Sequence, residues 1–384
     1  MKKFLFDLIA TQPSPEAKFH GGSEYAKQIF HSLSHYNSME CIYDDRLPLD
    51  EGIRGVIEEK KIKLHIVRSN LDLEKLFLNT DALGFYSAIP YRYGMLKTYE
   101  KKIIMTIHGI RDIECYGDET EIKYRNKITS KVKLIVKNIL FPGKRKRKAA
   151  KDNILKLINK DNISIITDSE HSKYSLITNF PFLSEDKINV HPCPIELNNR
   201  EFDVEKSEEY FLLVSANRWI KNNYRAIKAL DNLISKKLID KQVVVLGSSG
   251  AGLENYILNK NNFSFLNYVS HEELDQYFFN AYCFIYPTLN EGYGYPPIQA
   301  MQFSTPVIAS ACTSVPEVCQ DAALYFNPLS IEELEVRILN LYRSESLRNK
   351  LRLNGEKRVE YLKQQNSKYL ENIKDFILCE FGII

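Results

Sequence analysis

The chain has 384 residues, of which 44% are hydrophobic and 26% charged, and its formal net charge is +3. This length exceeds one ordinary core and predicts two domains, and the composition is typical of a soluble globular protein rather than a disordered or fibrous one. Seven scattered cysteines without a CxxC pair argue against a disulfide framework or zinc site and favour a reducing cytosol. No run of about 18 apolar residues is present, so no membrane-spanning helix is expected.

The first apolar run lies at the start of the chain. Residues 3–10 are mostly apolar, Asp7 interrupts them and no clear cleavage site follows, so we predict a first strand rather than a signal peptide. Ten further runs are predicted as strands, at residues 63–67, 82–87, 102–108, 163–169, 188–193, 210–216, 242–248, 263–269, 283–288 and 306–311. Amphipathic segments separate many of them, which is typical of parallel strands covered on both faces. The sequence therefore predicts an α/β protein with doubly wound parallel sheets.

A proline-bearing and then acidic stretch near residues 192–209 divides the chain into similar halves, as an interdomain linker does. We predict an N-terminal Rossmann-like domain over 1–197, a C-terminal one over 198–365, and a terminal helix over 366–384 that packs back on the N-terminal domain. Two such domains facing each other form a cleft at the carboxyl ends of their strands, where open α/β sheets bind ligands. Functional residues are therefore expected in loops that follow strands.

Two such loops stand in the first half. Gly21 and Gly22, in "FHGGSEYAKQIF", permit close backbone approach, and Ser23 or Glu24 opens a helix. Free N–H groups at a helix start suit an anion such as a diphosphate, although a plain tight turn explains the glycine pair equally well. His108 ends the predicted strand of "TIHGIRD". A buried histidine satisfied by backbone is the commoner explanation for any single histidine, but the strand-end position favours the cleft.

The segment 121–160 carries an unusual charge pattern. Twelve Lys or Arg and no Asp or Glu stand between residues 122 and 151, so a segment of charge +12 is set in a chain of net charge +3. Apolar residues inside it recur at spacings of 4, 3 and 4, which predicts one helical stripe of Ile128, Val132, Ile135 and Ile139. A basic amphipathic helix is typical of attachment to anionic lipid, to which each cation contributes about 1 kcal/mol.

We therefore predict a membrane-docking segment at residues 121–151. Its docking cations are predicted to be Lys127, Lys131, Lys144, Arg145, Lys146, Arg147 and Lys148. One alternative is a core helix followed by a solvated basic loop. Another is nucleic-acid binding by "KRKRK", which lacks interleaved aromatic residues or a recognition module. The absence of acidic residues over this length favours the membrane.

Cations also follow the first predicted strand of the second half. In "SANRWIKNN", Arg218 and Lys221 stand three residues apart just before a helix. A guanidinium and an ammonium together can neutralise a diphosphate and stabilise it as a leaving group. Exposed loop cations are usually only solvated, but the strand–loop–helix setting favours the functional interpretation.

The clearest motif is "YPTLNEGYGYPPIQAM", residues 286–301. Glu291 follows a strand, and Gly292 and Gly294 keep the backbone bare. Two prolines at 296 and 297 fit the first turn of a helix, so loop amides are expected to point at a ligand whose hydroxyls Glu291 accepts. Gln299 is expected in the same first turn, facing the same ligand. The alternative is a structural glycine turn with an incidental acid.

No Asp-x-Asp motif follows a predicted strand. The adjacent acids of "YDDR", residues 43–46, stand in a polar stretch, and we interpret them as a solvated turn rather than a magnesium site. The sequence therefore predicts no metal site.

The order of these loops resembles that of the retaining group-one glycosyltransferases, which have the GT-B fold. The second half resembles that family nearly end to end, and the first half more loosely, at "GGSEYA", "TIHG" and "ITDSEHSKYSLI". The resemblance implies that His108, Arg218, Lys221 and Glu291 are the catalytic residues. It implies that the donor-binding residues are Gly21, Gly22, Gly292, Tyr293, Gly294, Tyr295 and Gln299. The amides of residues 293 to 295 would hold sugar hydroxyls, and the two cations would hold the phosphates.

One position departs from the family pattern. The second glutamate of its Glu-x7-Glu motif normally binds the nucleotide ribose, and this chain has Gln299 there. An amide both accepts and donates hydrogen bonds, and ribose hydroxyls do the same, so the contact can survive. A non-catalytic or degenerate sugar-nucleotide-binding protein is the alternative, and a phosphorylase or epimerase of the same fold is a further one.

The resemblance also implies a reaction. It implies retaining, metal-independent transfer of a hexose from a GDP- or UDP-sugar, with GDP-mannose slightly preferred, to a lipid-linked or glycan acceptor in bacterial surface polysaccharide assembly. No cofactor is expected, because the nucleotide-sugar is a substrate. The expected partners are the donor, the acceptor and an anionic membrane surface, without nucleic acid. The expected location is cytoplasmic, peripheral at the inner face of the cytoplasmic membrane.

Overall fold

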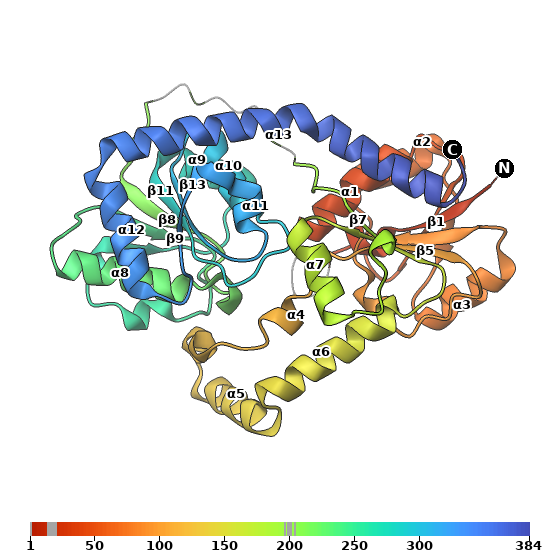
Figure 1. Ribbon diagram of the computed structural model, residues 1–384, viewed down its shortest axis with the longest axis horizontal. Helices are drawn as coiled ribbons and strands as arrows, with labels where there is room; N and C mark the ends of the chain where they lie inside the picture. Colours follow the sequence, from red (N-terminus) through yellow and green to blue (C-terminus); the bar gives the residue numbers. More distant parts are fainter. Residues whose placement is uncertain (1, 14–20, 196, 198–201, 203–204) are drawn as a thin grey trace. The chain divides into compact units, whose positions relative to one another are not determined.

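The computed structural model describes residues 2–13, 21–195, 197, 202 and 205–384 (Figure 1). Its contacts divide the chain into two compact units, each made of segments distant in sequence. Unit 1 comprises residues 1–110, 148–195 and 364–384, and unit 2 comprises 111–147 and 196–363. The division differs from the predicted domains in one main respect, because the basic segment up to residue 147 belongs to unit 2. Its buried contacts with unit 2, described below, are the reason.

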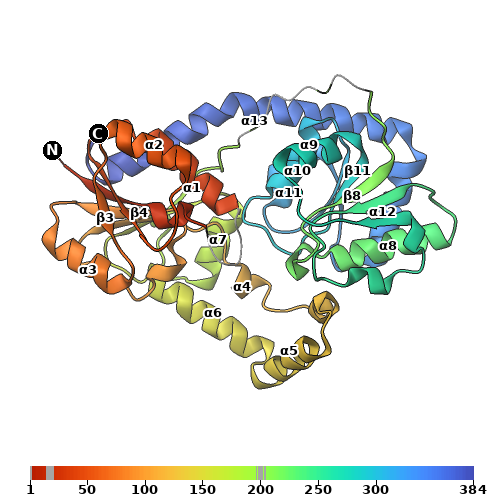
Figure 2. The same ribbon diagram turned by 180° about the vertical axis from the view of Figure 1, so that it is seen from behind.

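Unit 1 is built on a seven-stranded parallel sheet of order β3-β2-β1-β4-β5-β6-β7. Figure 2 labels β3 and β4 of this sheet. Its strands are β1 (Phe4–Asp7), β2 (Met39–Tyr43), β3 (Leu64–Ile66), β4 (Gly84–Ser87), β5 (Lys102–Thr106), β6 (Ile163–Thr167) and β7 (Ile188–Val190). Its helices include α1 (Gly21–Leu33), α2 (Glu51–Lys60), α3 (Asn70–Asn79) and α7 (Glu170–Asn179). Apolar side chains of β1, α1 and α2 share one buried core.

Unit 2 is built on a six-stranded parallel sheet of order β10-β9-β8-β11-β12-β13. Its strands are β8 (Tyr210–Leu213), β9 (Gln242–Val245), β10 (Phe263–Phe265), β11 (Ala281–Tyr286), β12 (Val307–Ser310) and β13 (Ala323–Phe326). Its helices include α4 (Arg111–Glu114), α5 (Ile128–Leu140), α8 (Asn223–Ser235), α9 (His271–Asn280), α10 (Tyr295–Gln302), α11 (Val315–Cys319) and α12 (Ile331–Arg343). Helices α8 and α12 pack together, and α9 packs with α10.

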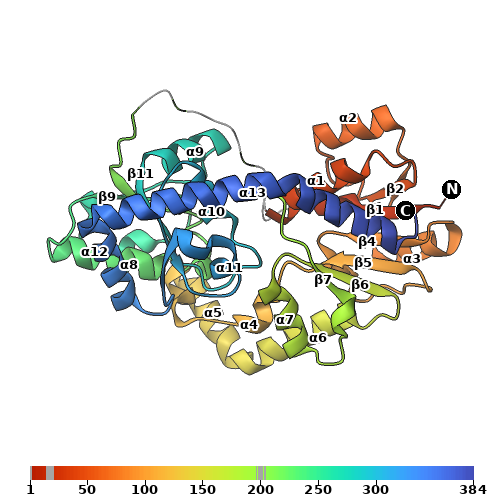
Figure 3. The same cartoon turned by 45° about the horizontal axis from the view of Figure 1, so that its top comes forward.

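Two helices contribute to both units. Helix α6 (Gly143–Ile158) begins in unit 2 and continues in unit 1, and α13 (Glu345–Glu380) does the same (Figure 3). Ile373, Ile377 and Leu378 of α13, with Phe381 after it, are buried in the core of unit 1. Phe381 stacks on Phe4 of β1 at 4.9 Å between ring centroids. The last part of the chain therefore packs in the core of unit 1, against its sheet.

The two parallel sheets confirm the predicted fold class, but the sequence patterns missed two strands. Strand β2 contains Glu40, whose buried carboxylate pairs with Lys3 at 2.9 Å and with His65 at 2.6 Å. Strand β13 lies at an edge and is partly exposed. A charge inside a strand and a half-covered edge both interrupt the continuous apolar run that marks a buried parallel strand.

In each sheet the chain reverses its direction of strand addition next to the first strand. This switch point lies between β1 and β4 in unit 1, and between β8 and β11 in unit 2. Loops that leave the carboxyl ends of such neighbouring strands diverge and leave room for a ligand. The loops after β8 and β11 carry Lys221 and Glu291, so the predicted motifs of the second half meet at a switch point.

Candidate active site

The loops after β8 and β11 are joined to each other by backbone and side chains. The Leu289 N–H donates to the Ile220 carbonyl at 2.9 Å. Asn222 is fully buried with φ of 56°, in the left-handed region that asparagine tolerates. Its Nδ2 donates to the carbonyls of Pro287 at 2.9 Å and Pro328 at 2.7 Å. Asn222 therefore turns the chain into α8 and holds the neighbouring loop in place.

Lys221 and Glu291 form a direct ion pair. The Lys221 Nζ lies 2.6 Å from the Glu291 Oε1, and the two side chains are only 11% and 16% exposed. The same Oε1 accepts from the Thr288 hydroxyl at 2.7 Å, and Nζ also donates to the Tyr286 hydroxyl at 3.2 Å. Strand β11 and the loop after it thus supply two hydroxyl groups, those of Tyr286 and Thr288, that hold the Lys221 ammonium and the Glu291 carboxylate in position.

Each residue of this pair favours the charged form of the other, whereas burial favours the neutral form of both. Burial lowers the pKa of Lys221 against the opposing effect of Glu291, and the charge of Arg218 lowers it further. Burial alone would raise the pKa of Glu291, but the Lys221 ammonium and the Thr288 hydroxyl hold it below its ordinary value. Glu291 is therefore a fixed carboxylate at neutral pH, able to accept hydrogen bonds and unable to donate them.

Side chains from the next loop fix the backbone around Glu291. The Glu291 N–H donates to the Thr313 hydroxyl at 3.0 Å. The Ser314 hydroxyl donates to the carbonyls of Glu291 at 3.1 Å and of Tyr293 at 2.9 Å. Gly294 then adopts φ of 102°, where a side chain would be strained, and it caps α10. These contacts and the left-handed Gly294 together hold the loop in this conformation.

Helix α10 begins as predicted, with prolines in its first turn after Gly294. Tyr293 and Tyr295 flank that glycine, and each is half-buried. Gln299 lies one turn later than predicted, because the helix begins at Tyr295 and Gln299 is its fifth residue. Its side chain is half-buried and has no hydrogen bond to another residue of the described ranges.

Arg218 stands three residues before Lys221 in the same loop. Its side chain is exposed, and it precedes the short 3-10 helix Trp219–Lys221. The Lys221 N–H donates to the Arg218 carbonyl at 2.9 Å, so the two residues lie in one turn of the chain. The structure thus brings together three of the four predicted catalytic residues, all within unit 2.

The sequence patterns missed the residues that position this cluster. Thr288, Thr313, Ser314 and Asn222 each hold a loop or a charged group, and each resembles an ordinary polar loop residue in the sequence. A usable signal was the pair of hydroxyl residues directly before α11, because side chains at a helix start commonly bond nearby backbone.

His108, the fourth predicted catalytic residue, lies in unit 1 after β5. Its Nδ1 is 2.6 Å from the Asp168 Oδ2, and its Nε2 is 3.0 Å from the Ala88 carbonyl. Burial lowers the pKa of His108, but Asp168 and the Ala88 carbonyl raise it by more, so it lies above the ordinary 6.5. The Asp168 Oδ1 is buried without a partner among the residues described, so His108 is the main compensation for that carboxylate. The Tyr25 ring packs edge-on at 5.0 Å between centroids.

The glycine pair of unit 1 differs from its prediction. Gly21 and Gly22 are the first residues of α1, so they lie inside the first helical turn and not in a turn before it. A Cβ built at Gly21 meets nothing within 4 Å. The residues directly before the pair, 14–20, lie outside the described ranges.

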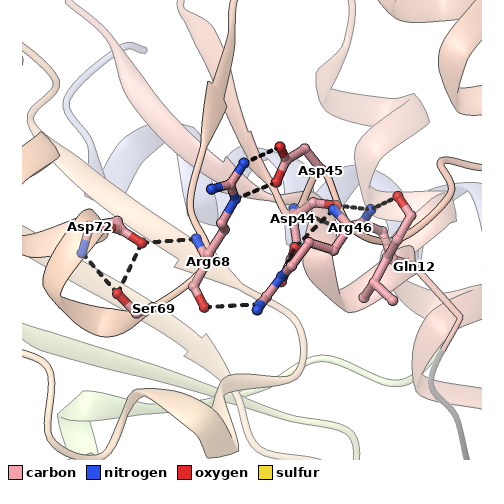
Figure 4. A network of polar contacts seen from close by, with 8 residues as sticks. Gln12, Asp44, Asp45, Arg46, Arg68, Ser69 and Asp72 are labelled. Atoms are coloured by element: carbon pink, nitrogen blue, oxygen red, sulfur yellow. Dashed lines mark hydrogen bonds and ion pairs between the residues drawn. The ribbon is translucent and has the colours of Figure 1, made fainter.

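The acids of "YDDR" are both paired with arginines (Figure 4), and Asp45 and Arg46 lie exposed in a turn as predicted, whereas Asp44 is buried. Arg46 contacts both carboxylate oxygens of Asp44, which lowers the pKa of Asp44 to about 2. Asp45 pairs with Arg68 at 2.7 Å and 2.5 Å, and Gln12 bonds the Asp44 backbone at 2.9 Å in both directions. This corner of unit 1 is therefore a satisfied structural network. Within the described ranges, no three His, Cys, Asp or Glu side chains are grouped as metal ligands.

The comparisons with known proteins concern the family and the fold. Residues 195–358 match the family described as "Glycosyl transferases group 1". The whole chain has the GT-B fold. Sucrose-phosphate synthase from Thermosynechococcus elongatus superposes with a TM-score of 0.72 at 13% identity, over 100% of both chains. WaaG, a glycosyltransferase involved in lipopolysaccharide biosynthesis, superposes with a TM-score of 0.65 at 12% identity, over 97% of this chain and 99% of its own.

Two relatives found by sequence have more specific descriptions, but they align with only part of this chain. The O-antigen chain mannosyltransferase RfbU of Salmonella typhimurium is 32% identical over 197 residues, which cover 49% of this chain and 53% of the relative. The O-antigen chain mannosyltransferase B of Escherichia coli is 37% identical over 84 residues, or 22% of each chain. The matches thus span about half of the first relative and less of the second.

In the described part of the chain, no helix combines the length and apolar character needed to cross a membrane.

Proposed function

We propose that this protein is a retaining glycosyltransferase that moves a hexose from a nucleotide-sugar to a glycan or lipid-linked acceptor. The observation that carries the proposal is the Lys221–Glu291 pair at the switch point of unit 2, with Arg218 beside it and the start of α10 next to it. Fixed positive charge and a fixed carboxylate suit the two ends of a sugar diphosphate.

In the proposed reaction, the bond between the sugar C1 and the phosphate oxygen breaks while the acceptor oxygen bonds to C1. Lys221 and Arg218 stabilise the charge that develops on the leaving diphosphate, and the N–H groups at the start of α10 add to it. A diphosphate oxygen takes the acceptor proton. These two cations supply the positive charge for the leaving group, so we propose that transfer needs no metal.

Glu291 is proposed to hold the donor sugar by accepting from its hydroxyls. Its Oε1 is used by Lys221 and Thr288, so Oε2 is the oxygen assigned to the sugar. Lys221 has three donors, and its bonds to Glu291 and Tyr286 use two of them, so one is assigned to a phosphate oxygen. His108 is proposed to bind a hydroxyl of the donor sugar, which requires its Nε2 to exchange the Ala88 carbonyl for that hydroxyl.

The relatives guide the choice of substrates. Two are described as O-antigen chain mannosyltransferases, which favours a GDP-mannose-like donor and an O-antigen-type acceptor. The Anabaena protein HepE, known in complex with UDP-glucose, superposes with a TM-score of 0.66 at 13% identity, which keeps a UDP-sugar in consideration. The proposed location is the inner face of the cytoplasmic membrane, where a lipid-linked acceptor is reached.

Thermal-shift screening against GDP-, UDP- and dTDP-sugars tests donor choice, because a ligand that binds the folded state raises its apparent stability. Transfer is then measured with the donor that binds, in buffer containing EDTA, and NMR of the product identifies the anomeric configuration. Retention at C1 and full activity in EDTA are expected; inversion or a metal requirement would contradict the mechanism.

Substitutions test the site itself. Lys221→Ala and Glu291→Ala are each expected to reduce transfer by about 100-fold or more, because both act on groups of the reacting donor. Lys350→Ala, at an exposed position of α13, is the matched control and should leave transfer unchanged. Near-normal rates in both site variants would remove the proposal. Tight nucleotide-sugar binding without any transfer or hydrolysis would favour a non-catalytic binding protein, which the amide at Gln299 keeps as the second candidate.

A further inference from the structure

Helix α5 exposes the face that an amphipathic helix normally buries. Its apolar stripe, spaced by 4, 3 and 4 residues, is solvent-exposed at Ile128 (78%), Val132 (51%), Ile135 (46%) and Ile139 (72%). Val136, Leu140 and Phe141 extend this apolar face and are exposed as well. Leu134, on the opposite side, is the one buried residue of α5. The alternative of a core helix is therefore wrong for this stripe. Contiguous exposed apolar surface of this kind marks an interaction site.

Positive charge surrounds the stripe. Lys133 and Lys137 are exposed on α5 itself, Lys127 caps its start, and Lys144 and Arg145 follow its end. No acidic residue stands between residues 122 and 151. An apolar face bordered by lysines fits a helix that lies in the plane of an anionic bilayer surface.

The predicted docking cations do not all contribute equally. Lys127, Lys144, Arg145, Arg147 and Lys148 are exposed, whereas Lys131 and Lys146 are half-buried. Lys131 donates to the Tyr256 hydroxyl at 3.4 Å, and Lys146 to the Asn138 side chain at 2.6 Å. Lys148 belongs to unit 1, and the other six belong to unit 2. Arg147 donates to the Ile113 carbonyl at 3.2 Å. Lys127, Lys144 and Arg145 are thus the predicted docking cations that stand exposed in unit 2 at the two ends of α5.

The segment before α5 is anchored in unit 2 by buried polar contacts. Arg225 of α8 bonds both oxygens of Asp118, at 3.0 Å and 3.1 Å, and neither side chain is more than 9% exposed. The Tyr124 hydroxyl accepts from the Tyr224 N–H at 2.8 Å, and Tyr124 is buried in the core of unit 2. These contacts attach α5 to the unit that carries Lys221 and Glu291.

The same segment touches the Glu291 loop directly. The Asn290 Nδ2 donates to the Glu114 Oε2 of α4 at 2.6 Å, one residue before Glu291. The 3-10 helix Glu119–Tyr124 packs against the 3-10 helix Trp219–Lys221. The segment that carries α5 is therefore in contact with both loops that carry Lys221 and Glu291.

We propose that α5 inserts its apolar stripe into the headgroup region of an anionic lipid bilayer, with the flanking cations on the lipid phosphates, and that this surface is a part of unit 2. The membrane thereby holds the unit that we propose binds the donor. The proposal of a docking surface depends only on the exposure and charge of α5. Its role, which is to bring the donor-binding unit to a lipid-linked acceptor, rests on the proposed function.

Other occupants fit the surface less well. Two copies of this chain would bring two strongly positive segments together, which repel each other. Nucleic acid would satisfy the cations but would leave the apolar stripe in water. An anionic bilayer is the partner that satisfies both the charges and the stripe.

Vesicle binding by the full chain, measured by co-sedimentation without nucleotide-sugar, tests the proposal. Vesicles of phosphatidylcholine mixed with phosphatidylglycerol are expected to bind the protein, and vesicles of phosphatidylcholine alone to bind it weakly. Ile128→Ser with Ile139→Ser should reduce binding by about tenfold or more, since the inserted apolar area is lost. Leu353→Ser with Val336→Ser, at exposed apolar positions of α13 and α12, is the matched control and should have no effect.

The charge contribution is tested in parallel. Lys133→Gln, Lys137→Gln and Lys144→Gln together should weaken binding and reduce its sensitivity to salt, whereas the same change at Lys350, Lys357 and Lys363 of α13 should not. In Ile139→Trp, the fluorescence of the new side chain should be quenched by brominated lipid, which reports insertion directly.

Three outcomes would overturn the proposal. The first is vesicle binding that survives the Ile128 and Ile139 substitutions with unquenched tryptophan. The second is binding to RNA without binding to anionic vesicles. The third is self-association that the same substitutions abolish. Because no donor is present, an inactive protein that binds vesicles would refute the proposed function and leave this surface standing.

Discussion

Replacing Lys221 with methionine would remove the positive charge 2.6 Å from Glu291 while keeping an unbranched side chain of similar length. The two side chains are 11% and 16% exposed, so water can replace the lost partner only in part. With an effective dielectric constant of about 20, two unit charges at this separation attract by about 6 kcal/mol, and desolvation offsets about half of that. We therefore expect Lys221→Met to lower the free energy of unfolding of unit 2 by about 3 kcal/mol.

The chain supplies a convenient probe for this measurement. Trp219 is its only tryptophan and lies in the same 3-10 helix as Lys221, so its fluorescence during denaturant unfolding reports on unit 2. Glu291→Gln and the double variant complete a thermodynamic cycle, in which we expect a coupling energy of about 2–3 kcal/mol. Lys350→Met, at an exposed site, is the control. A coupling energy under about 0.5 kcal/mol would refute the reasoning.

Three further predictions concern single groups. Burial raises the pKa of Asp7 to about 6 from 3.8, so the folded state holds a proton that the unfolded chain has lost, and the free energy of unfolding should fall as pH rises from about 4 to 6. Asp7→Asn should abolish that fall, and an unchanged pH profile would disprove the assignment. NMR titration should give His108 a pKa above 6.5, and its contribution to the free energy of unfolding, present below pH 6.5, should be lost as pH rises through the folded pKa. Asp168→Asn should remove the upward shift of this pKa. A pKa at or below 6.5 in the parent protein would contradict the prediction. Gln299→Glu restores the usual family residue. It is expected to change donor affinity by less than about tenfold, because an amide and a carboxylate can both accept from ribose hydroxyls. A much larger gain in affinity, measured by calorimetry, would show that the amide weakens donor binding.

The chemistry of the candidate site was predictable because it depends on local patterns. A strand followed by an acid, glycines and prolines predicts a loop and helix start around Glu291 whatever the rest of the chain does. The apolar runs likewise predicted the parallel sheets, because strands buried on both faces cannot contain many polar residues. Lys221 was found for the same reason, from its position directly after a strand.

The partners of these residues were not predictable in the same way. Lys221 and Glu291 are 70 residues apart, and no pattern near either one indicates that their charges are 2.6 Å apart. Thr313 and Ser314 hold the Glu291 loop from another strand end, and the sequence shows them only as common polar residues. Contacts between distant segments depend on sheet order, which short-range patterns do not encode.

The amino-acid sequence by itself determined the fold class, the position of the glycine and proline loop, and the apolar stripe of α5 with its cations. Only the tertiary structure decided that this stripe faces solvent and that its segment belongs to unit 2. The stripe has the same spacing whether it packs on a core or faces a membrane, so periodicity alone leaves both open. The deciding contact is the buried Arg225–Asp118 pair, which joins residues 107 positions apart in the chain and attaches the basic segment to the second sheet.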